Sequence, residues 1–170
     1  MKKYLSERAK WWPVSPELMA SYRDGSHTHN FGNAELAWWK DGYFHRDGDK
    51  PAYIGSDGSL EWYKNGQYHR DGDLPAIIYA DGELAWFKNG VRHRDGDKPA
   101  WIRADSTLQW YKNDEWHRTT GPAIIHPNNK HRYWINGVDI TKEVKSWLKT
   151  RKYRVPFTLE QQAEFNLTFG

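Results

Sequence analysis

The sequence predicts a mainly β protein: an antiparallel β-meander of hairpin repeats that forms a solenoid, with small helical caps at both ends. Tryptophan recurs every 24 residues, and Asp-Gly or Asn-Gly pairs separate short β-forming runs, which is the strongest short-range signal of tight hairpins. Aromatic residues make up 16% of the chain, so a polar sequence still has large rings to bury. The recurring tryptophans are Trp38, Trp62, Trp86, Trp110 and Trp134.

Each repeat has the same order of residues. After the Trp come Lys-Asn-Gly or a close variant, then His-Arg, then Asp-Gly-Asp-x-Pro-Ala. The fourth link is one residue shorter and runs from Thr119 to Ala123. A degenerate repeat, which begins at Tyr22, precedes the regular repeats. A fixed period of this length indicates supersecondary units that bury their apolar faces only against their neighbours.

Within one unit, residues 76–93 are expected to form three strands joined by turns at Asp81-Gly82 and Asn89-Gly90. If both turns are two-residue loops, Ile77 pairs with Trp86 and Trp86 pairs with His93, all on one face. The corresponding residues of that face are Tyr53, Trp62 and His69 in one neighbour, and Trp101, Trp110 and His117 in the other. The opposite face then carries Ile78, Ala85, Phe87 and Arg92.

The ends differ from the repeats. We expect an N-terminal helical cap over residues 1–21, five repeats over 22–137 with the first degenerate, and a C-terminal helical cap over 138–170. At the front, Leu5, Ala9 and Trp12 suggest one short helix and Ser15-Pro16-Glu17 the start of another. At the back, Ile140, Val144, Trp147 and Leu148 have helical spacing after a capping Thr141, and Thr158 with Gln161 predicts a capping box. These caps are expected to cover the open sheet edges.

Composition excludes several classes of function. The chain has no Cys, which removes disulfides, thiolate nucleophiles and Cys-ligated zinc. It has no signal-peptide h-region and no apolar run long enough to span a membrane, so a soluble cytoplasmic protein without membrane contact is expected. No cofactor motif, nucleophile elbow or phosphate loop is found. Because the polar residues recur in step with the fold, we expect no catalytic residues and no enzyme.

The recurring histidines and aspartates are predicted to be structural. His45, His69, His93 and His117 lie one repeat apart, about 10 Å in a meander, which is too far to share a metal ion. Each ring is expected to pack on Trp with one nitrogen bonded to backbone. The Asp-Gly-Asp loops lack a full calcium ligand set and are predicted to form turns, neutralised by the neighbouring Arg. The pair His27 and His29 is a weak metal candidate, and no metal site is predicted.

Nucleic acid is the main alternative partner, because aromatic residues alternate with cations and the formal net charge is +3. However, residues 45–68 and 69–92 each have a net charge of −1, so the repeats are not a phosphate track. The alternative site is therefore the basic C-terminal segment. Its residues are Lys145, Lys149, Arg151, Lys152 and Arg154.

The segments from Trp62 to Gly72 and from Trp86 to Gly96 resemble the MORN family of β-hairpin repeats, with one extra residue and His-Arg-Asp-Gly in place of the tighter family form. They are closer to a MORN-like variant with His-Arg-x-x-Gly-Pro-Ala that occurs in phage, giant-virus and some bacterial proteins. The resemblance covers roughly residues 22–137. It implies a hairpin-repeat fold, whereas MORN proteins range in function from membrane-associated scaffolds to enzyme appendages and antitoxin-like proteins.

We therefore expect a non-catalytic protein-binding repeat module, and the phage resemblance implies a protein that binds and inhibits a host defence protein. Rings that follow the recurring Trp should point away from it, and with two arginines they are the candidate contacts. Sequestration of a small anionic ligand by repeated Arg and His, and a homodimer through the sheet edges, remain open. The candidate contacts are Trp39, Tyr63, Phe87, Tyr111, Arg92 and Arg118.

Overall fold

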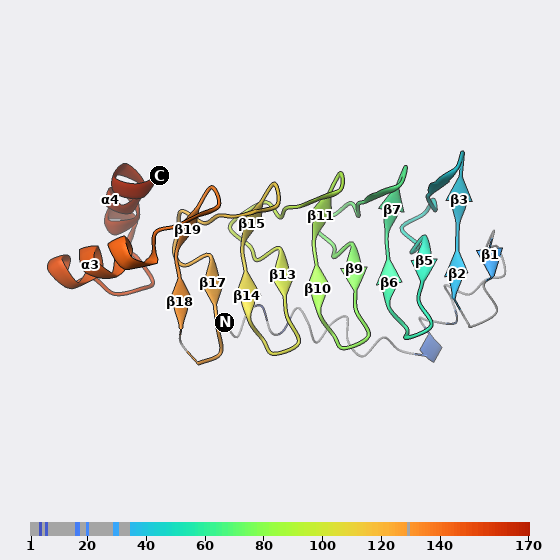
Figure 1. Ribbon diagram of the computed structural model, residues 1–170, viewed down its shortest axis with the longest axis horizontal. Coiled ribbons are helices and arrows are strands. Elements are labelled where there is room, and N and C mark those ends of the chain that lie inside the picture. Colours follow the sequence, from blue (N-terminus) through green and yellow to red (C-terminus); the bar gives the residue numbers. More distant parts are fainter. Residues whose placement is uncertain are drawn as a thin grey trace.

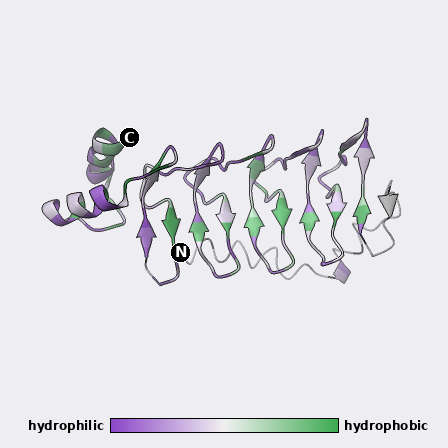
Figure 2. Cartoon of the chain, in the orientation of Figure 1, coloured by the Kyte–Doolittle hydropathy of each residue, from purple (hydrophilic) through white to green (hydrophobic). Residues whose placement is uncertain are grey.

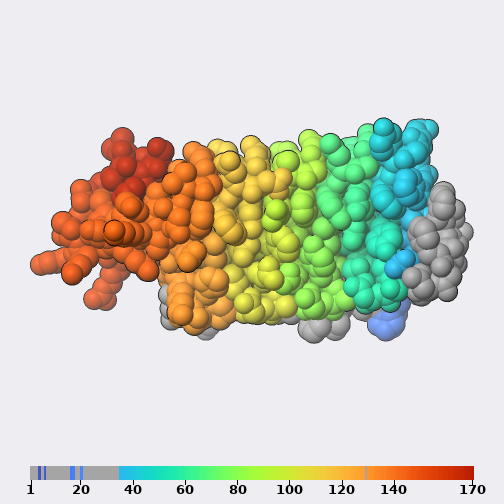
Figure 3. Space-filling model, viewed as in Figure 1, coloured from blue at the N-terminus to red at the C-terminus, as the bar shows by residue number. Residues whose placement is uncertain are grey.

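The computed structural model describes residues 35–128 and 130–170, together with seven isolated residues near the N-terminus. Several predicted features lie outside the described residues. They are the helices expected around Leu5 to Trp12 and after Ser15, the start of the degenerate repeat at Tyr22, and His27. Five of the isolated residues near the N-terminus are helical. The isolated residues are Tyr4, Ser6, Pro16, Glu17, Ala20, His29 and Asn30. The hairpins follow one another along the long axis of an elongated molecule (Figures 1 and 3).

Ten two-residue strands form one long sheet in which every pair is antiparallel and successive strands are neighbours (Figure 1). The strands are, in spatial order, β1 (His29–Asn30), β2 (Leu36–Ala37), β5 (Tyr53–Ile54), β6 (Leu60–Glu61), β9 (Ile77–Ile78), β10 (Leu84–Ala85), β13 (Trp101–Ile102), β14 (Leu108–Gln109), β17 (Ile124–Ile125) and β18 (His131–Arg132). The predicted antiparallel meander is confirmed.

Each repeat adds a small hairpin beyond the long sheet, closed by the Asn-Gly turn or its variant. These hairpins are β3 (Trp39–Lys40) with β4 (Tyr43–Phe44), β7 (Tyr63–Lys64) with β8 (Gln67–Tyr68), β11 (Phe87–Lys88) with β12 (Val91–Arg92), β15 (Tyr111–Lys112) with β16 (Glu115–Trp116), and β19 (Trp134–Ile135) with β20 (Val138–Asp139). Their register is the predicted one, since Phe87 lies opposite Arg92 and the His93 N–H donates to the Trp86 carbonyl at 3.3 Å.

The register predicted for the first turn of each repeat is wrong by one residue. Ile77 lies opposite Ala85, because the turn at residues 80–82 has three residues: the Tyr79 N–H donates to the Glu83 carbonyl at 3.0 Å. The Asp81 carboxylate accepts from the Glu83 N–H at 3.0 Å and stabilises this turn. A one-residue shift turns every side chain to the other face. Ile78 therefore shares a face with Trp86, and Ile77 lies on the opposite face.

The face that carries the recurring Trp is the core of the repeats, here called the core face. Its buried residues are Leu36, Trp38, Ile54, Leu60, Trp62, Ile78, Leu84, Trp86, Ile102, Leu108 and Trp110, all at most 5% exposed. Figure 2 shows the hydrophobic colour on strands of the long sheet and polar residues at the hairpin ends. Tyr4 packs edge-on against Trp110, with ring centroids 5.7 Å apart, so this residue lies on the core face.

The 24-residue spacing predicts Trp134 as the fifth ladder Trp, and this prediction is wrong. The fourth link is one residue shorter, so the last repeat is displaced by one position and Tyr133 takes the place of the ladder Trp. Tyr133 is 3% exposed, whereas Trp134 is half-buried and lies on the opposite face.

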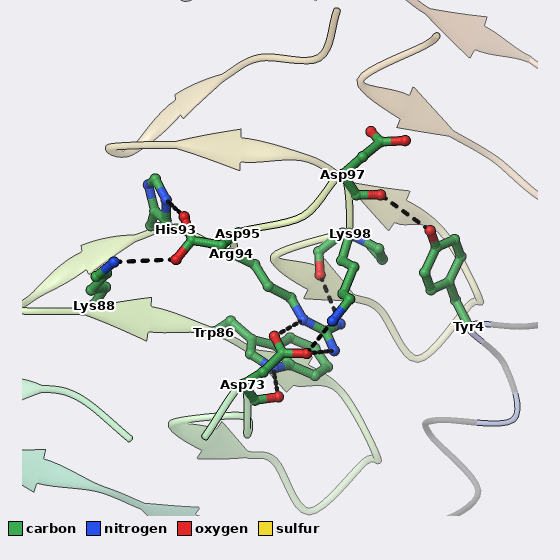
Figure 4. Close-up of polar contacts among 10 residues, drawn as sticks. Tyr4, Asp73, Trp86, Lys88, His93, Arg94, Asp95, Asp97 and Lys98 are labelled. Atoms are coloured by element: carbon green, nitrogen blue, oxygen red, sulfur yellow. Dashed lines mark hydrogen bonds and ion pairs between the residues drawn. The ribbon is translucent and has the colours of Figure 1, made fainter. Parts of the chain in front are cut away.

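Arginine side chains cover the ladder tryptophans. The Arg94 guanidinium lies 3.9 Å above the Trp86 ring, donates to both carboxylate oxygens of Asp73 in the preceding repeat at 2.7 and 3.2 Å, and donates to the Pro99 carbonyl (Figure 4). Arg70 and Arg118 form the same contacts with Asp49 and Asp97. The second Asp of each loop is thus neutralised by the Arg of the following repeat, not by its sequence neighbour as predicted.

Two helices close the C-terminal end, α3 (Thr141–Arg151) and α4 (Leu159–Phe169), both in predicted positions. The capping box of Thr158 with Gln161 is present. Thr141 does not cap α3: its hydroxyl instead accepts from the Tyr133 backbone N–H at 3.0 Å. The helices pack on the last hairpin around Tyr133, Trp147 and Phe165. Among the described residues, neither helix nor any other is long and apolar enough to cross a membrane.

Candidate functional site

Positions that differ between repeats gather on the face opposite the core face, here called the open face. The core face repeats Ile, Leu and Trp at fixed positions, and the links repeat His, Arg and Pro-Ala. On the open face, by contrast, the first strand position of successive repeats changes from Tyr53 through Ile77 and Trp101 to Ile124. The two rings are half-buried, whereas the two isoleucines are at most 5% exposed. Residues shared by all repeats are sufficient to build the fold, so the variable face is the candidate functional surface.

A row of planar side chains runs along the open face through all five hairpins. The first four neighbouring pairs of rings have centroids 4.2 to 5.0 Å apart and planes inclined by 29° to 37°. Beyond Arg92, the rings continue through Tyr111–Trp116 at 5.8 Å and Trp116–Trp134 at 4.9 Å. The members of this planar row are Trp39, Phe44, Tyr63, Tyr68, Phe87, Arg92, Tyr111, Trp116 and Trp134.

Ring faces in the first part of the planar row are covered by neighbouring rings. Because each ring from Phe44 to Tyr68 is stacked between two others, its faces are already occupied by neighbours. A surface that binds nucleic acid bases by stacking needs exposed ring faces. Ring edges, which carry the positive part of the aromatic quadrupole, instead suit carbonyl and carboxylate oxygens and apolar side chains.

Arg92 occupies a ring position in the third repeat. Its guanidinium lies 4.8 Å from the Tyr111 ring centroid and 5.4 Å from that of Trp101, so it continues the row as a planar cation. Asp114 holds it there: the Asp114 carboxylate accepts from the Arg92 backbone N–H at 2.9 Å and from its Nε–H at 3.1 Å.

Asp114 also breaks the pattern of the hairpin turn. It stands where Gly42, Gly66 and Gly90 stand in the first three described repeats, and it has a φ of 67°, a left-handed conformation that costs a non-Gly residue energy. The cost is offset by its two bonds to Arg92. An acidic side chain at this strained position therefore fixes the one cation of the planar row.

Glu61 organises the second repeat of the open face. Its carboxylate accepts from the Tyr63 hydroxyl at 2.7 Å and from the Tyr68 hydroxyl at 3.1 Å. Burial, with the hydrogen-bonded Glu61 beside it, raises the pKa of Tyr68 to about 12 and raises the pKa of Tyr63 as well. Both hydroxyls therefore stay protonated near neutral pH and remain fixed as donors.

Charge changes sign along the open face. The acidic Glu35 and Glu61 lie toward the β1 end, in the first two described repeats. In the middle, Glu83 pairs with Arg103 at 3.3 Å. Lys130 and Arg132 lie at the α3 end, beside the positive side chains of that helix. The face thus has an acidic aromatic end and a basic end.

A basic hollow of about 1530 Å³ lies at that end, between β18 and α3. Its cations are Lys130, Arg132, Lys142, Lys145 and Arg154, and its carboxylates are Asp139 and Glu143. Arg132 lies 3.8 Å from Asp139. In the described part of the chain, no carboxylate is within ion-pair distance of the other four cations. Desolvation, followed by the nearby Lys145 and His126, lowers the pKa of His131.

The structure brings together only some of the predicted contact residues. Trp39, Tyr63, Phe87 and Arg92 lie in the planar row, and Tyr111 belongs to it but is 8% exposed, with its hydroxyl donating to Gln109. Arg118 is bound to Asp97 over Trp110 and is not part of the open face. Phe44, Tyr68, Trp116 and Trp134 were not predicted as contacts, although the correctly predicted hairpin register places the first three opposite rings of the predicted set.

The structure brings together only two of the predicted basic C-terminal residues. Lys145 and Arg154 line the basic hollow, and Lys149 and Lys152 do not. Arg151 pairs with Glu164 and lies over Trp147. The contributions of Lys130 and Arg132 were not predicted, because they join the cluster only through the packing of α3 beside β18.

The recurring histidines connect adjacent repeats. His93 Nε2 lies 2.9 Å from Asp95, which Lys88 also contacts (Figure 4). The Asn89 backbone N–H donates to His69 Nδ1 at 3.1 Å. One ring nitrogen of His45, His69 and His117 bonds to backbone as predicted, whereas Nδ1 of His93 lies 3.1 Å from the Asn113 side chain. The first Asp of each complete loop holds the other nitrogen. No cluster of three metal-ligating side chains is present among the described residues.

Comparison with known proteins gives no assignment: no protein-family model, no curated protein and no solved structure matches this chain.

Proposed function

We propose that this chain is a non-catalytic protein-binding module, a MORN-like repeat solenoid whose open face contacts a protein partner. The observation that carries the proposal is the planar row, in which nine partly exposed or buried side chains form one continuous strip on the face where repeats differ. Trp, Tyr and Arg dominate the energetics of protein interfaces. Here they are held rigid by stacking, which lowers the entropy lost on binding.

The core face contributes to the fold in this proposal and not to binding. The guanidinium groups of Arg70, Arg94 and Arg118 are already bound to carboxylates, which disfavours sequestration of a small anionic ligand by these residues. The stacked rings disfavour base stacking by nucleic acid. The resemblance to phage repeat proteins adds a host defence protein as the proposed class of target.

The test is capture of partner from a cell lysate by the immobilised full-length chain, before and after nuclease treatment. The interface variant is Trp39→Ala with Arg92→Ala, which removes one exposed ring and the cation of the row. The matched control is Tyr43→Ala with Lys64→Ala, which removes an exposed ring and a cation from the opposite side of the hairpins.

The proposal expects one protein, captured in near-stoichiometric yield after nuclease, that is lost with the interface variant and kept with the control. Equal capture by the two variants would place the contact elsewhere. Recovery of nucleic acid alone, with no protein after nuclease, would overturn the proposal and favour the basic C-terminal end.

A further inference from the structure

We infer that the basic hollow between β18 and α3 binds an acidic segment of the protein partner, so that the partner is anchored at the α3 end of the open face. This inference rests on the proposed function and adds the chemistry of the partner. It starts from the cation excess of the hollow, five Lys and Arg side chains against two carboxylates.

The hollow is formed by elements that are distant in the sequence. Arg132 extends from the sheet edge, Lys142 and Lys145 from α3, and Arg154 from the segment that follows α3. Within the part of the chain that the structure describes, Lys130, Lys142, Lys145 and Arg154 have no carboxylate partner. Like charges held close together without counter-charges repel one another, and an anionic ligand relieves this repulsion.

Two histidines line the hollow beside these cations. His131 and His126 both line it, and burial, followed by the nearby Lys145 and His126, lowers the pKa of His131. A carboxylate bound among these groups would reverse that effect and favour the imidazolium form.

The shape of the site favours a protein segment over a nucleic acid. The cations line a hollow instead of following a line, whereas a phosphate backbone is usually bound by a linear track of cations. The hollow also has apolar walls, formed by Ile124, Leu148 and Val155. Carboxylate side chains on an extended peptide can reach the separate cations while the peptide contacts these walls.

The experiment measures binding of fluorescent decaglutamate to the full-length chain by anisotropy at low salt. The test variant is Lys145→Glu with Arg154→Glu. The control is Lys149→Glu with Lys152→Glu, which makes the same change of net charge on exposed residues at the same end of the molecule, outside the hollow. The test variant should raise Kd about tenfold, as expected for the loss of two charge-assisted contacts, and the control by less than about twofold.

A second readout requires no variant. Saturating decaglutamate should shift the NMR ring resonances of His131 and raise its pKa, and should leave those of His45, four repeats away, unchanged. Equal weakening by test and control variants, or equal shifts at both histidines, would overturn the inference. Tighter binding of a single-stranded DNA of equal charge, lost with the same test variant, would overturn it in favour of a phosphate ligand.

Failure of this inference can be separated from failure of the proposed function. Partner capture is tested at Trp39 and Arg92, whereas decaglutamate binding is tested at Lys145 and Arg154. If the hollow binds no acidic peptide and the Trp39 and Arg92 variant still loses the partner, the open face remains the interface.

Discussion

Arg94 and Asp73, in adjacent repeats, form a bidentate ion pair at 2.7 and 3.2 Å while the guanidinium lies flat on Trp86. The Arg94 side chain is only 4% exposed, whereas Asp73 is 40% exposed. This contact joins one repeat to the next, and its equivalents recur at Arg70 and Arg118.

Arg94→Ala should lower the free energy of unfolding by about 2–4 kcal/mol, because it uncovers Trp86 and leaves Asp73 without its main partner. The control is Arg103→Ala. Arg103 is 43% exposed and pairs with Glu83, so its loss should cost at most about 1 kcal/mol. Urea unfolding of both variants measures the difference, and losses of equal size would show that the repeats are not joined through these arginines.

Asp73 should make the free energy of unfolding depend on pH. Burial alone would raise the pKa of its carboxyl, but hydrogen bonds from Arg94 and Lys98 outweigh this effect and hold the pKa below its usual value. A depressed folded-state pKa contributes stability above the unfolded value, and that stability is lost as the pH falls through the folded value. The difference in unfolding free energy between the wild type and Asp73→Asn should therefore be constant above about pH 5 and shrink below about pH 4. A difference that does not change with pH would contradict the ion pair.

Asp114→Gly should separate stability from binding. Glycine relieves the left-handed strain, a gain of about 1 kcal/mol, and removes the bonds to Arg92, a loss of similar size, so the melting temperature should change little. The released Arg92 side chain should weaken partner capture. Asp114→Asn, which keeps an oxygen acceptor in the turn, should retain more binding than Asp114→Gly, and the reverse order would show that Asp114 does not position Arg92.

Thr119→Asp should raise the pKa of His117. In the preceding described repeats an Asp stands two residues after the His and bonds its Nε2 at 2.9 or 3.0 Å, whereas Thr119 offers no carboxylate. Desolvation, with Lys112 nearby, lowers the pKa of His117. A restored carboxylate favours the charged ring, so NMR titration of the variant should give a higher pKa for His117 than in the wild type. No movement would mean that the shorter link holds residue 119 out of reach.

Much of the fold follows from the repeat pattern, because each turn signal and each recurring Trp constrains the same meander. The register error at Ile77 came from the Asp81-Gly82 turn. The Asp-Gly pair predicts a two-residue loop, whereas the Asp81 carboxylate accepts from the Glu83 N–H and stabilises a three-residue loop. The error at Trp134 came from counting 24 residues across a link that is one residue shorter.

The candidate surface was predictable where it depends on strand alternation. Trp39, Tyr63 and Phe87 follow a core Trp and therefore lie on the other face. The basic hollow was not predictable, because the packing of α3 beside β18, which brings Lys145 to Arg132, depends on tertiary contacts of Trp147 and Phe165 that no local pattern specifies.

Photocrosslinking from two positions of one hairpin shows which face of the repeats binds the partner. Trp39 and Tyr43 are 37% and 59% exposed and lie on opposite faces of the β3–β4 hairpin, so p-benzoylphenylalanine at each position samples a different side of the molecule. After irradiation in lysate, we expect a discrete adduct with one protein from position 39 and none from position 43. An adduct from position 43 alone would contradict the assignment of the open face as the partner-binding surface.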